Sequence, residues 1–331
     1  MGSRPAGGRR HLWAVGVALV LGIAALAYWW IRVPGRVVVR TVPSGVRVSV
    51  DGESRGTTSD SGLVVLFDEP ARHLVVCTAA GYESDSSTVS LDFGQVVRLD
   101  VVLNPLGMAY IRGGTFGMGD PDGDYNERPA HDVRLNAFYI DRYEVRTSEF
   151  RRLWSSRALP FTDPDDPVAG VSWEEARDFC RSVGKRLPRE AEWERACRGP
   201  TGLRYGIGDA FDPSRARIGR SLDDGPARVG SFSPGGEGVH DLTGNVWEWC
   251  SDWYGRDAYR DHPKENPKGP PGGVRHVFRG GAWYSNARYA RCSHRPGNIR
   301  RGLDRSIGFR CVKDVESGSV LGAPYGQDYG G

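Results

Sequence analysis

Asp241-Leu-Thr-Gly-Asn-Val-Trp-Glu-Trp249 carries the clearest fold signal in this chain of 331 residues. The whole sequence is rich in glycine and tryptophan, with 45 and 10 residues. This composition predicts a loop-rich fold whose turns are held by aromatic packing. A content of 39% hydrophobic and 26% charged residues is that of a folded protein. The net charge is only +3, so we expect no nucleic-acid partner.

Two helices are predicted upstream of this block. Ser172-Trp-Glu-Glu175 is a capping box, with Ser172 as the N-cap and Glu175 three positions later. An apolar stripe follows and Gly184 ends this helix; the stripe consists of Ala176, Phe179, Cys180 and Val183. The second helix is expected from about Pro188 to Cys197 and ends at Gly199.

Eight blocks between residues 110 and 312 resemble, in the same order, the formylglycine-generating enzyme (sulfatase-modifying factor) family. The resemblance implies an α+β, loop-rich fold related to C-type lectins over residues 106–313. The blocks are Tyr110–Gly119, Glu127–His131, Phe138–Val145, Pro167–Trp173, Gly184–Glu194, Asp241–Trp249, Arg279–Trp283 and Gly308–Val312.

The family's catalytic site departs from its pattern here. Family catalysis uses two cysteines that bind copper(I), a soft ion that prefers sulfur ligands. The matching positions are Ser285 and Ala290, and two neighbouring positions that usually hold serine and asparagine are Ala282 and Ser306. We therefore expect a catalytically degenerate domain with no copper.

The resemblance also implies two disulfide bonds. Carried over residue by residue, the family's pairing gives Cys180–Cys311 and Cys197–Cys292, which fits export to an oxidising compartment. Four free buried thiols are the alternative. Cys77 lies in an apolar strand and is expected to be a buried small hydrophobic residue.

The family binds calcium in the loop that this chain forms from Asp241, Gly244, Val246 and Glu248. Side chains act at the first and last positions and carbonyl oxygens at the middle two, a set of hard ligands that suits Ca²⁺. We expect one structural Ca²⁺ ion there. The alternative gives Asp241 a turn-capping role and Glu248 a buried ion pair.

Arginine and aromatic side chains are abundant where the family's substrate groove lies. Such side chains are typical anchors of protein interfaces, so this segment is a candidate face for a protein partner. A solvated face with internal ion pairs is the alternative. The candidate residues are Trp283, Tyr284, Arg288, Tyr289, Arg291, Arg295, Arg300 and Arg301.

Residues 35–104 predict a small all-β domain. Arg36–Arg40 and Val46–Val50 alternate apolar and polar residues, Asp51-Gly52 then turns the chain, and further strands are expected at 63–67, 73–78 and 96–103. The glycine and turn pattern resembles the PEGA domain, which implies an extracytoplasmic spacer. Asn104-Pro105 is the predicted linker.

The N-terminal region predicts a membrane anchor. Residues 12–31 form an uncharged apolar run of about the length that spans a bilayer, and arginines in residues 1–11 favour a cytoplasmic N-terminus. A signal peptide cleaved after Ala27 is the alternative. Residues 314–331 form a glycine-rich tail.

Together these features predict a single-pass membrane protein with a periplasmic or otherwise extracytoplasmic body. We expect a structural or binding module, with a protein partner at the membrane, as in an accessory subunit of a membrane complex. An enzyme of the wider family with altered chemistry, using Ser285, His294 or another metal, is the first alternative. Lectin-like binding through calcium is the second.

Overall fold

The computed structural model describes residues 33–296 and 304–315, in two compact units that divide between Leu103 and Asn104. The predicted anchor at residues 12–31, the N-terminal residues 1–11 and the tail after Val315 lie outside the described residues. Over the two described ranges, no helix is both long and apolar enough to cross a membrane.

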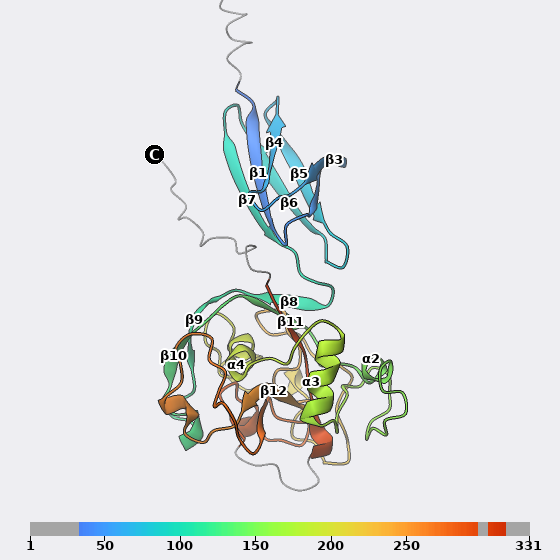
Figure 1. Ribbon diagram of the computed structural model, residues 1–331, viewed down its shortest axis with the longest axis vertical. Coiled ribbons are helices and arrows are strands. Elements are labelled where there is room, and N and C mark those ends of the chain that lie inside the picture. Colours follow the sequence, from blue (N-terminus) through green and yellow to red (C-terminus); the bar gives the residue numbers. More distant parts are fainter. Residues whose placement is uncertain (1–32, 297–303, 316–331) are drawn as a thin grey trace, which may run out of the picture. The chain divides into compact units, whose positions relative to one another are not determined.

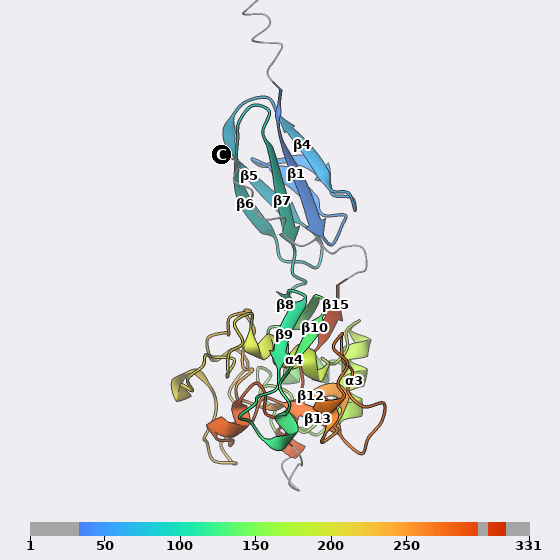
Figure 2. The same ribbon diagram turned by 90° about the vertical axis from the view of Figure 1, so that its left-hand side faces the viewer.

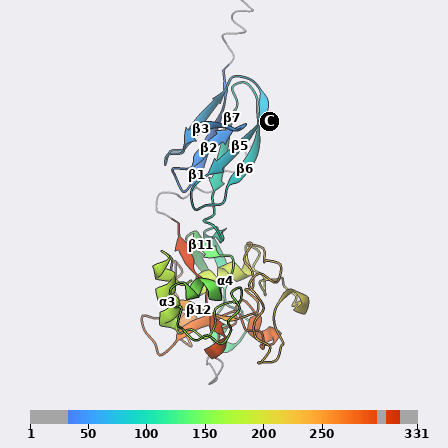
Figure 3. The ribbon, with the colours of Figure 1, turned by 90° about the vertical axis from the view of Figure 1, so that its right-hand side faces the viewer.

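The first unit is a sandwich of two β-sheets. In one sheet, β1 (Gly35–Val42) pairs antiparallel with β4 (Leu63–Phe67) and parallel with β7 (Val96–Val102) (Figure 1). The other sheet has the order β3-β2-β5-β6 (Figure 3). Its strands are β2 (Arg47–Val50), β3 (Glu53–Thr57), β5 (Ala71–Thr78) and β6 (Asp85–Leu91).

Alternating valines build the core of this sandwich. Val37 and Val39 of β1 are fully buried and pack with Val48 of β2 and with Cys77 of β5. The pattern of alternation therefore predicted these strands correctly, as well as the burial of Cys77. β3 and β6 were not predicted, because both are mainly polar and expose most of their side chains.

The second unit combines three small sheets with short helices. The sheets have the orders β10-β9, β15-β11-β8 and β13-β12-β14. Their strands are β8 (Met108–Ile111), β9 (Gly114–Met118), β10 (His131–Leu135), β11 (Phe138–Asp141), β12 (Trp247–Trp253), β13 (His276–Arg279), β14 (Ile307–Gly308) and β15 (Val312–Asp314).

The predicted capping box starts the longest helix of this unit. The Ser172 hydroxyl accepts the Glu175 N–H at 3.1 Å, and the Glu175 carboxylate accepts the Ser172 N–H at 2.8 Å. Val183 follows the helix as its C-cap and is 45% exposed, so it does not belong to the buried stripe as expected. The α-helices are α2 (Thr147–Arg151), α3 (Trp173–Ser182) and α4 (Glu190–Arg198).

The first and last strands of the second unit share one sheet. β11 lies between β8 and β15, so the last strand of the unit lies close to its first (β8 and β15 in Figure 2). β15 extends to Asp314, which pairs with Arg186, so the unit reaches one residue beyond the predicted end at 313. Short 3₁₀ helices fill the loops: η1 (Tyr125–Glu127), η2 (Pro213–Arg215), η3 (Ala258–Arg260), η4 (Ala287–Ala290) and η5 (Asp304–Ser306).

Candidate functional site

Ser285, which matches the family's first catalytic cysteine, lies in a closed turn after β13. The Ser285 N–H donates to the Ala282 carbonyl at 2.8 Å, and the Ser285 hydroxyl accepts the Ala282 N–H at 3.0 Å. Ser285 is 4% exposed and Ala282 is fully buried. The hydroxyl therefore holds the turn together and is shielded from solvent.

The other two degenerate positions pack close to this turn. Ala290 is fully buried at the end of η4, and a Cβ on Gly281 would lie 3.3 Å from its Cα. The hydroxyls of Ser306 and Tyr284 are 3.0 Å apart, and Tyr284 also accepts the Trp247 indole N–H at 3.1 Å. The structure thus brings the degenerate positions together as a packed, mainly apolar region.

The loop expected to hold calcium contains two carboxylates with protein partners. Asp241 has a positive φ of 61°, and its Oδ2 accepts the Gly230 N–H at 2.7 Å. Both oxygens of Glu248 accept hydrogen bonds of 2.7 Å from Arg310, and Oε2 also accepts the Trp193 indole N–H at 2.8 Å. Gly244 is required here, because a Cβ would collide with the Arg217 carbonyl.

Glu144 is a third carboxylate at this loop, and it was not among the predicted site residues. Its Oε1 accepts the Asn245 amide N–H at 2.9 Å, whereas its buried Oε2 has no hydrogen-bond partner. Burial, followed by the charge of Asp241, raises the pKa of Glu144 well above its usual range. Burial also raises the pKa of Asp241. Glu144 lies in the Phe138–Val145 block beside two other charged residues, so the sequence did not single it out.

These groups can accommodate a hard cation. Glu144, Asp241 and Glu248 face the single guanidinium of Arg310, which leaves two surplus negative charges when all three are ionised. An unpartnered, buried carboxylate oxygen is costly without a proton or an ion. Oxygen ligands of this kind suit Ca²⁺.

The prediction of a partner face is wrong for three of the residues assigned to it. Trp283, Arg291 and Arg295 are at most 4% exposed, so they cannot contact a partner. Arg291 forks onto Glu127 at 2.8 and 2.9 Å, and Arg295 forks onto Glu190 at 2.7 and 2.9 Å. The arginines instead neutralise carboxylates that the core has buried.

Part of that face does reach solvent. Tyr289 is 43% exposed and the Arg288 side chain is 65% exposed, whereas Tyr284 is half-buried. Arg300 and Arg301 lie outside the described residues.

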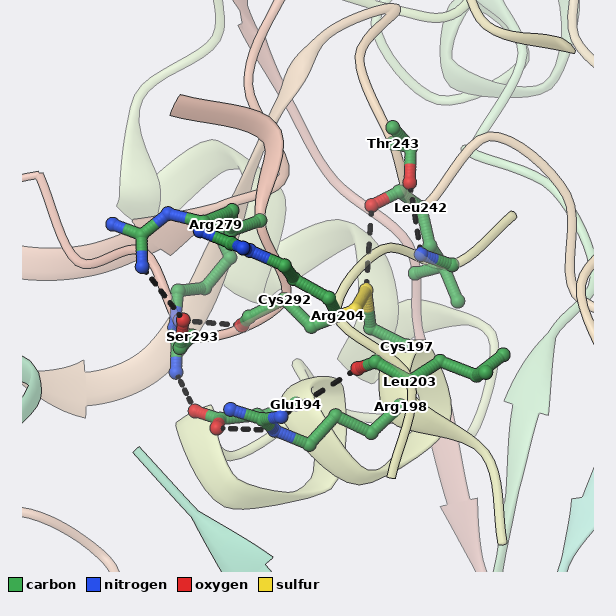
Figure 4. The surroundings of a disulfide bond; sticks show 12 residues. Glu194, Cys197, Arg198, Leu203, Arg204, Leu242, Thr243, Arg279, Cys292 and Ser293 are labelled. Atoms are coloured by element: carbon green, nitrogen blue, oxygen red, sulfur yellow. Dashed lines mark hydrogen bonds and ion pairs between the residues drawn. A yellow bond between two sulfur atoms is a disulfide. The ribbon is translucent and has the colours of Figure 1, made fainter. Parts of the chain in front are cut away.

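Both predicted disulfide bonds are present, Cys180–Cys311 and Cys197–Cys292. Figure 4 shows the second bond beside the buried ion pair of Arg279 with Glu194. Arg279 also donates to the Cys292 carbonyl at 2.8 Å, so the bridge and the ion pair fix the same loop. Cys77 and Cys250 are free and buried, and burial raises the pKa of Cys77 to about 11 and that of Cys250 well above its usual range.

The comparison with known families agrees with this architecture. Residues 96–315 match the Sulfatase-modifying factor enzyme 1-like domain, and residues 34–106 match the PEGA domain. The chain therefore belongs to the formylglycine-generating enzyme family and carries a PEGA domain ahead of the family domain.

Individual relatives cover the chain to different extents. Serine/threonine-protein kinase Pkn1 of Chlamydia trachomatis serovar L2 is 37% identical over 67% of this chain, which spans only 41% of the kinase. Formylglycine-generating enzyme of Streptomyces coelicolor is 33% identical over 65% of this chain and 92% of the enzyme. The solved structure of Treponema denticola variable protein 1 has a TM-score of 0.55 and 24% identity, covering 62% of this chain and 94% of that one, and it supports the fold alone.

Proposed function

We propose that the chain is a membrane-anchored, extracytoplasmic protein whose family domain has lost the formylglycine-generating reaction. In this proposal the domain acts as a structural or binding module, such as an accessory subunit of a membrane protein complex. The observation that carries the proposal is the turn at Ser285 and Ala290. Neither residue has a thiol, and both are buried, at 4% and 0% exposed.

The remaining cysteines supply no substitute for a copper(I) site. Four of them form the two disulfide bonds, and Cys250 is a fully buried thiol whose pKa is raised by its burial. Copper(I) binds thiolates, so a protonated, enclosed thiol is a poor ligand. The position of Cys77 in the PEGA domain does not recreate the family's cysteine pair.

Export and anchoring rest on two further observations. Disulfide bonds persist in oxidising compartments, and this chain has two of them. The apolar run at residues 12–31, with arginines before it, supports a single membrane pass with a cytoplasmic N-terminus. The PEGA domain would then be a spacer between the bilayer and the family domain.

A calcium ion in the loop of Asp241, Gly244, Val246 and Glu248 is part of the proposal. The surplus charge at Glu144, Asp241 and Glu248 supports it. Because Val246 and Glu248 are fully buried, such an ion would be enclosed, which favours a structural role over lectin-like sugar binding.

An enzyme with altered chemistry is the second candidate. It would use Ser285, His294 or another metal, and the described residues show no hydrogen bond or ion pair between Ser285 and His294. The Ser285 hydroxyl accepts a hydrogen bond from Ala282 of its own turn, and His294 lies beside Asp124 and Glu127. The geometry therefore supports the non-catalytic module better.

Copper(I) binding and peptide oxidation test the loss of the reaction. The wild-type chain should compete poorly for copper(I) with a chelator and should leave a cysteine-containing substrate peptide unoxidised. The variant Ser285→Cys/Ala290→Cys restores both thiols and should gain copper(I) affinity, which makes it a positive control. Oxidation of the peptide by the wild-type chain would overturn the proposal.

The binding role needs its own experiment. The full-length chain, purified from native membranes in mild detergent, should retain a protein partner at a fixed stoichiometry, identified by mass spectrometry. Recovery of the chain alone would count against an accessory subunit and would return attention to the region around Ser285.

A further inference from the structure

A second group of metal-ligating side chains lies outside the loop of Asp241 and Glu248. It brings together Asp124 and Glu127, from the loop after β9, and His294, from the loop after η4. The Asp124 side chain is 26% exposed, whereas Glu127 and His294 are 0% and 5% exposed. The group therefore combines two buried ligands with one that reaches solvent.

The acidic loop is shaped around the Glu127 carboxylate. The Asp120 N–H donates to the Glu127 carbonyl at 3.1 Å, which closes the loop on itself. A Cβ at residue 123 would collide with the Glu127 carboxylate, so Gly123 leaves the space in which this side chain lies. Arg291 then forks onto both oxygens of Glu127, at 2.8 and 2.9 Å, and fixes its orientation.

Two hydrogen bonds of its backbone hold His294 in place opposite the acidic loop. Its carbonyl accepts a hydrogen bond of 2.8 Å from the buried Arg279, and its N–H donates to the Arg291 carbonyl at 3.0 Å. Two residues earlier, Cys292 is tied to α4 by the disulfide bond to Cys197. The imidazole is thus placed by the backbone and by covalent structure, independently of the carboxylates.

The separations of the ligand atoms fit a metal ion. The His294 Nδ1 atom lies 3.5 Å from Asp124 Oδ2 and 3.5 Å from Glu127 Oε1, and all three atoms are within 4.8 Å of one another. Tetrahedral zinc with bonds of about 2.05 Å separates neighbouring ligand atoms by about 3.3 Å. Two of the three separations are thus within about 0.2 Å of the tetrahedral value, and the separation of the two carboxylate oxygens is at most 4.8 Å, so the carboxylates would close around an ion.

The His294 Nδ1 atom is the observation that points to a ligand. This buried nitrogen makes no hydrogen bond, and two carboxylate oxygens lie 3.5 Å from it. Either a proton on the imidazole, which makes these contacts ion pairs, or a metal ion between the three atoms satisfies it. An imidazole nitrogen with two carboxylates suits a divalent transition metal better than Ca²⁺, which prefers oxygen ligands throughout.

The net charge around the three ligands is compatible with a bound cation. Asp120, Asp124 and Glu127 are countered by Arg288 and Arg291, so one negative charge remains when His294 is neutral. Arg291 lies 3.8 Å from Asp124 Oδ2 and opposes a cation, which lowers affinity. It also donates to a ligand carboxylate, as partners behind metal ligands commonly do.

We propose that Asp124, Glu127 and His294 form a three-ligand site for a divalent transition metal ion of the zinc type. A tetrahedral ion would keep its fourth position for water or for a donor from a partner, on the side where Asp124 meets solvent. The site is independent of the family's copper chemistry and of the loop proposed for calcium.

The test uses the full-length chain in detergent, stripped with a chelator and then saturated with Ca²⁺, so that oxygen-only sites do not compete. Equilibrium dialysis against Zn²⁺, with elemental analysis, should give one ion per chain. Asp124→Asn and His294→Gln should each weaken binding at least tenfold, because the first replaces a charged carboxylate with a neutral amide and the second removes the imidazole nitrogen. Asp122→Asn is the matched control, since Asp122 is exposed in the same loop and outside the ligand group, and it should bind as the wild type does.

Two results would overturn the proposal. One is a wild-type chain that takes up no stoichiometric Zn²⁺. The other is equal uptake by Asp124→Asn and the wild type, which would place any bound zinc elsewhere. Because Asp124 is partly exposed, Asp124→Asn should leave the fold intact. This variant therefore tests the proposal even if His294→Gln fails to fold.

Discussion

Removing the two disulfide bonds should have effects that do not add, because one bridge is nested within the other. Cys180–Cys311 spans 131 residues, and Cys197–Cys292 lies inside it and spans 95 residues. In the chain-entropy treatment, closing either loop alone stabilises the fold by about 5 kcal/mol. With one bridge intact, however, the unfolded chain is already constrained.

The nested arrangement determines how much the stabilisation by one bridge depends on the presence of the other. When the inner bridge is closed, the outer bridge closes a path of only 36 residues, the difference between 131 and 95. Its contribution then falls to about 3.8 kcal/mol. The inner bridge, closed within the outer one, contributes about 3.5 kcal/mol by the same treatment. The first bridge removed should therefore cost about 1.2 kcal/mol less than the same bridge removed second.

Denaturant unfolding of three variants measures this difference. They are Cys180→Ala/Cys311→Ala, Cys197→Ala/Cys292→Ala and the fourfold variant, compared with the wild type under one set of conditions. Tryptophan fluorescence follows the family domain, because the described part of the PEGA domain contains no tryptophan. Equal costs in both contexts, or a cost below about 1 kcal/mol for either bridge, would refute the chain-entropy reasoning.

Two further predictions concern buried carboxylates. Burial and the charge of Glu190 raise the pKa of Asp252 to about 7, so the contribution of Asp252 to stability should be largest below about pH 4 and fall by at most about 1.4 kcal/mol per pH unit up to about pH 7; relative to the wild type, Asp252→Asn should remove this part of the slope in urea unfolding between pH 4 and 8, and an unchanged slope would exclude Asp252 as its source. Ca²⁺ binding near Glu144 should release a proton, since the raised pKa of Glu144 favours its protonated form without an ion; calorimetric titrations in two buffers of different ionisation enthalpy should show this release, Glu144→Gln should lose it, and its absence from the wild type would contradict the proposed coupling.

The sequence predicted those features that depend on local chemistry or on a family pattern. The capping box at Ser172 involves only neighbouring residues, so it could be recognised directly. The family domain was recognised from several sequence blocks, and the disulfide pairs were implied by that resemblance. In the PEGA domain, the strands with alternating valines were found, and the polar strands β3 and β6 were not.

Long-range pairing was the main feature that the sequence could not show. Arg291 meets Glu127 across 164 residues, and Arg295 meets Glu190 across 105 residues. A run of arginines looks the same in sequence whether it faces solvent or neutralises buried carboxylates. Charged residues are usually exposed, so the prediction of a basic partner face followed the common case and failed for Arg291 and Arg295.

The parallel pairing of β1 with β7 has a mechanical consequence for the PEGA domain. These are the first and last strands of the unit, and they are in register over seven residue pairs, from Arg36–Val96 to Val42–Val102. Tension applied where the chain enters β1 and leaves β7 would load these hydrogen bonds in shear along about 23 Å, so that they resist together rather than opening one at a time. In the proposed anchored protein, this pairing would let the PEGA domain bear a pulling force without extending.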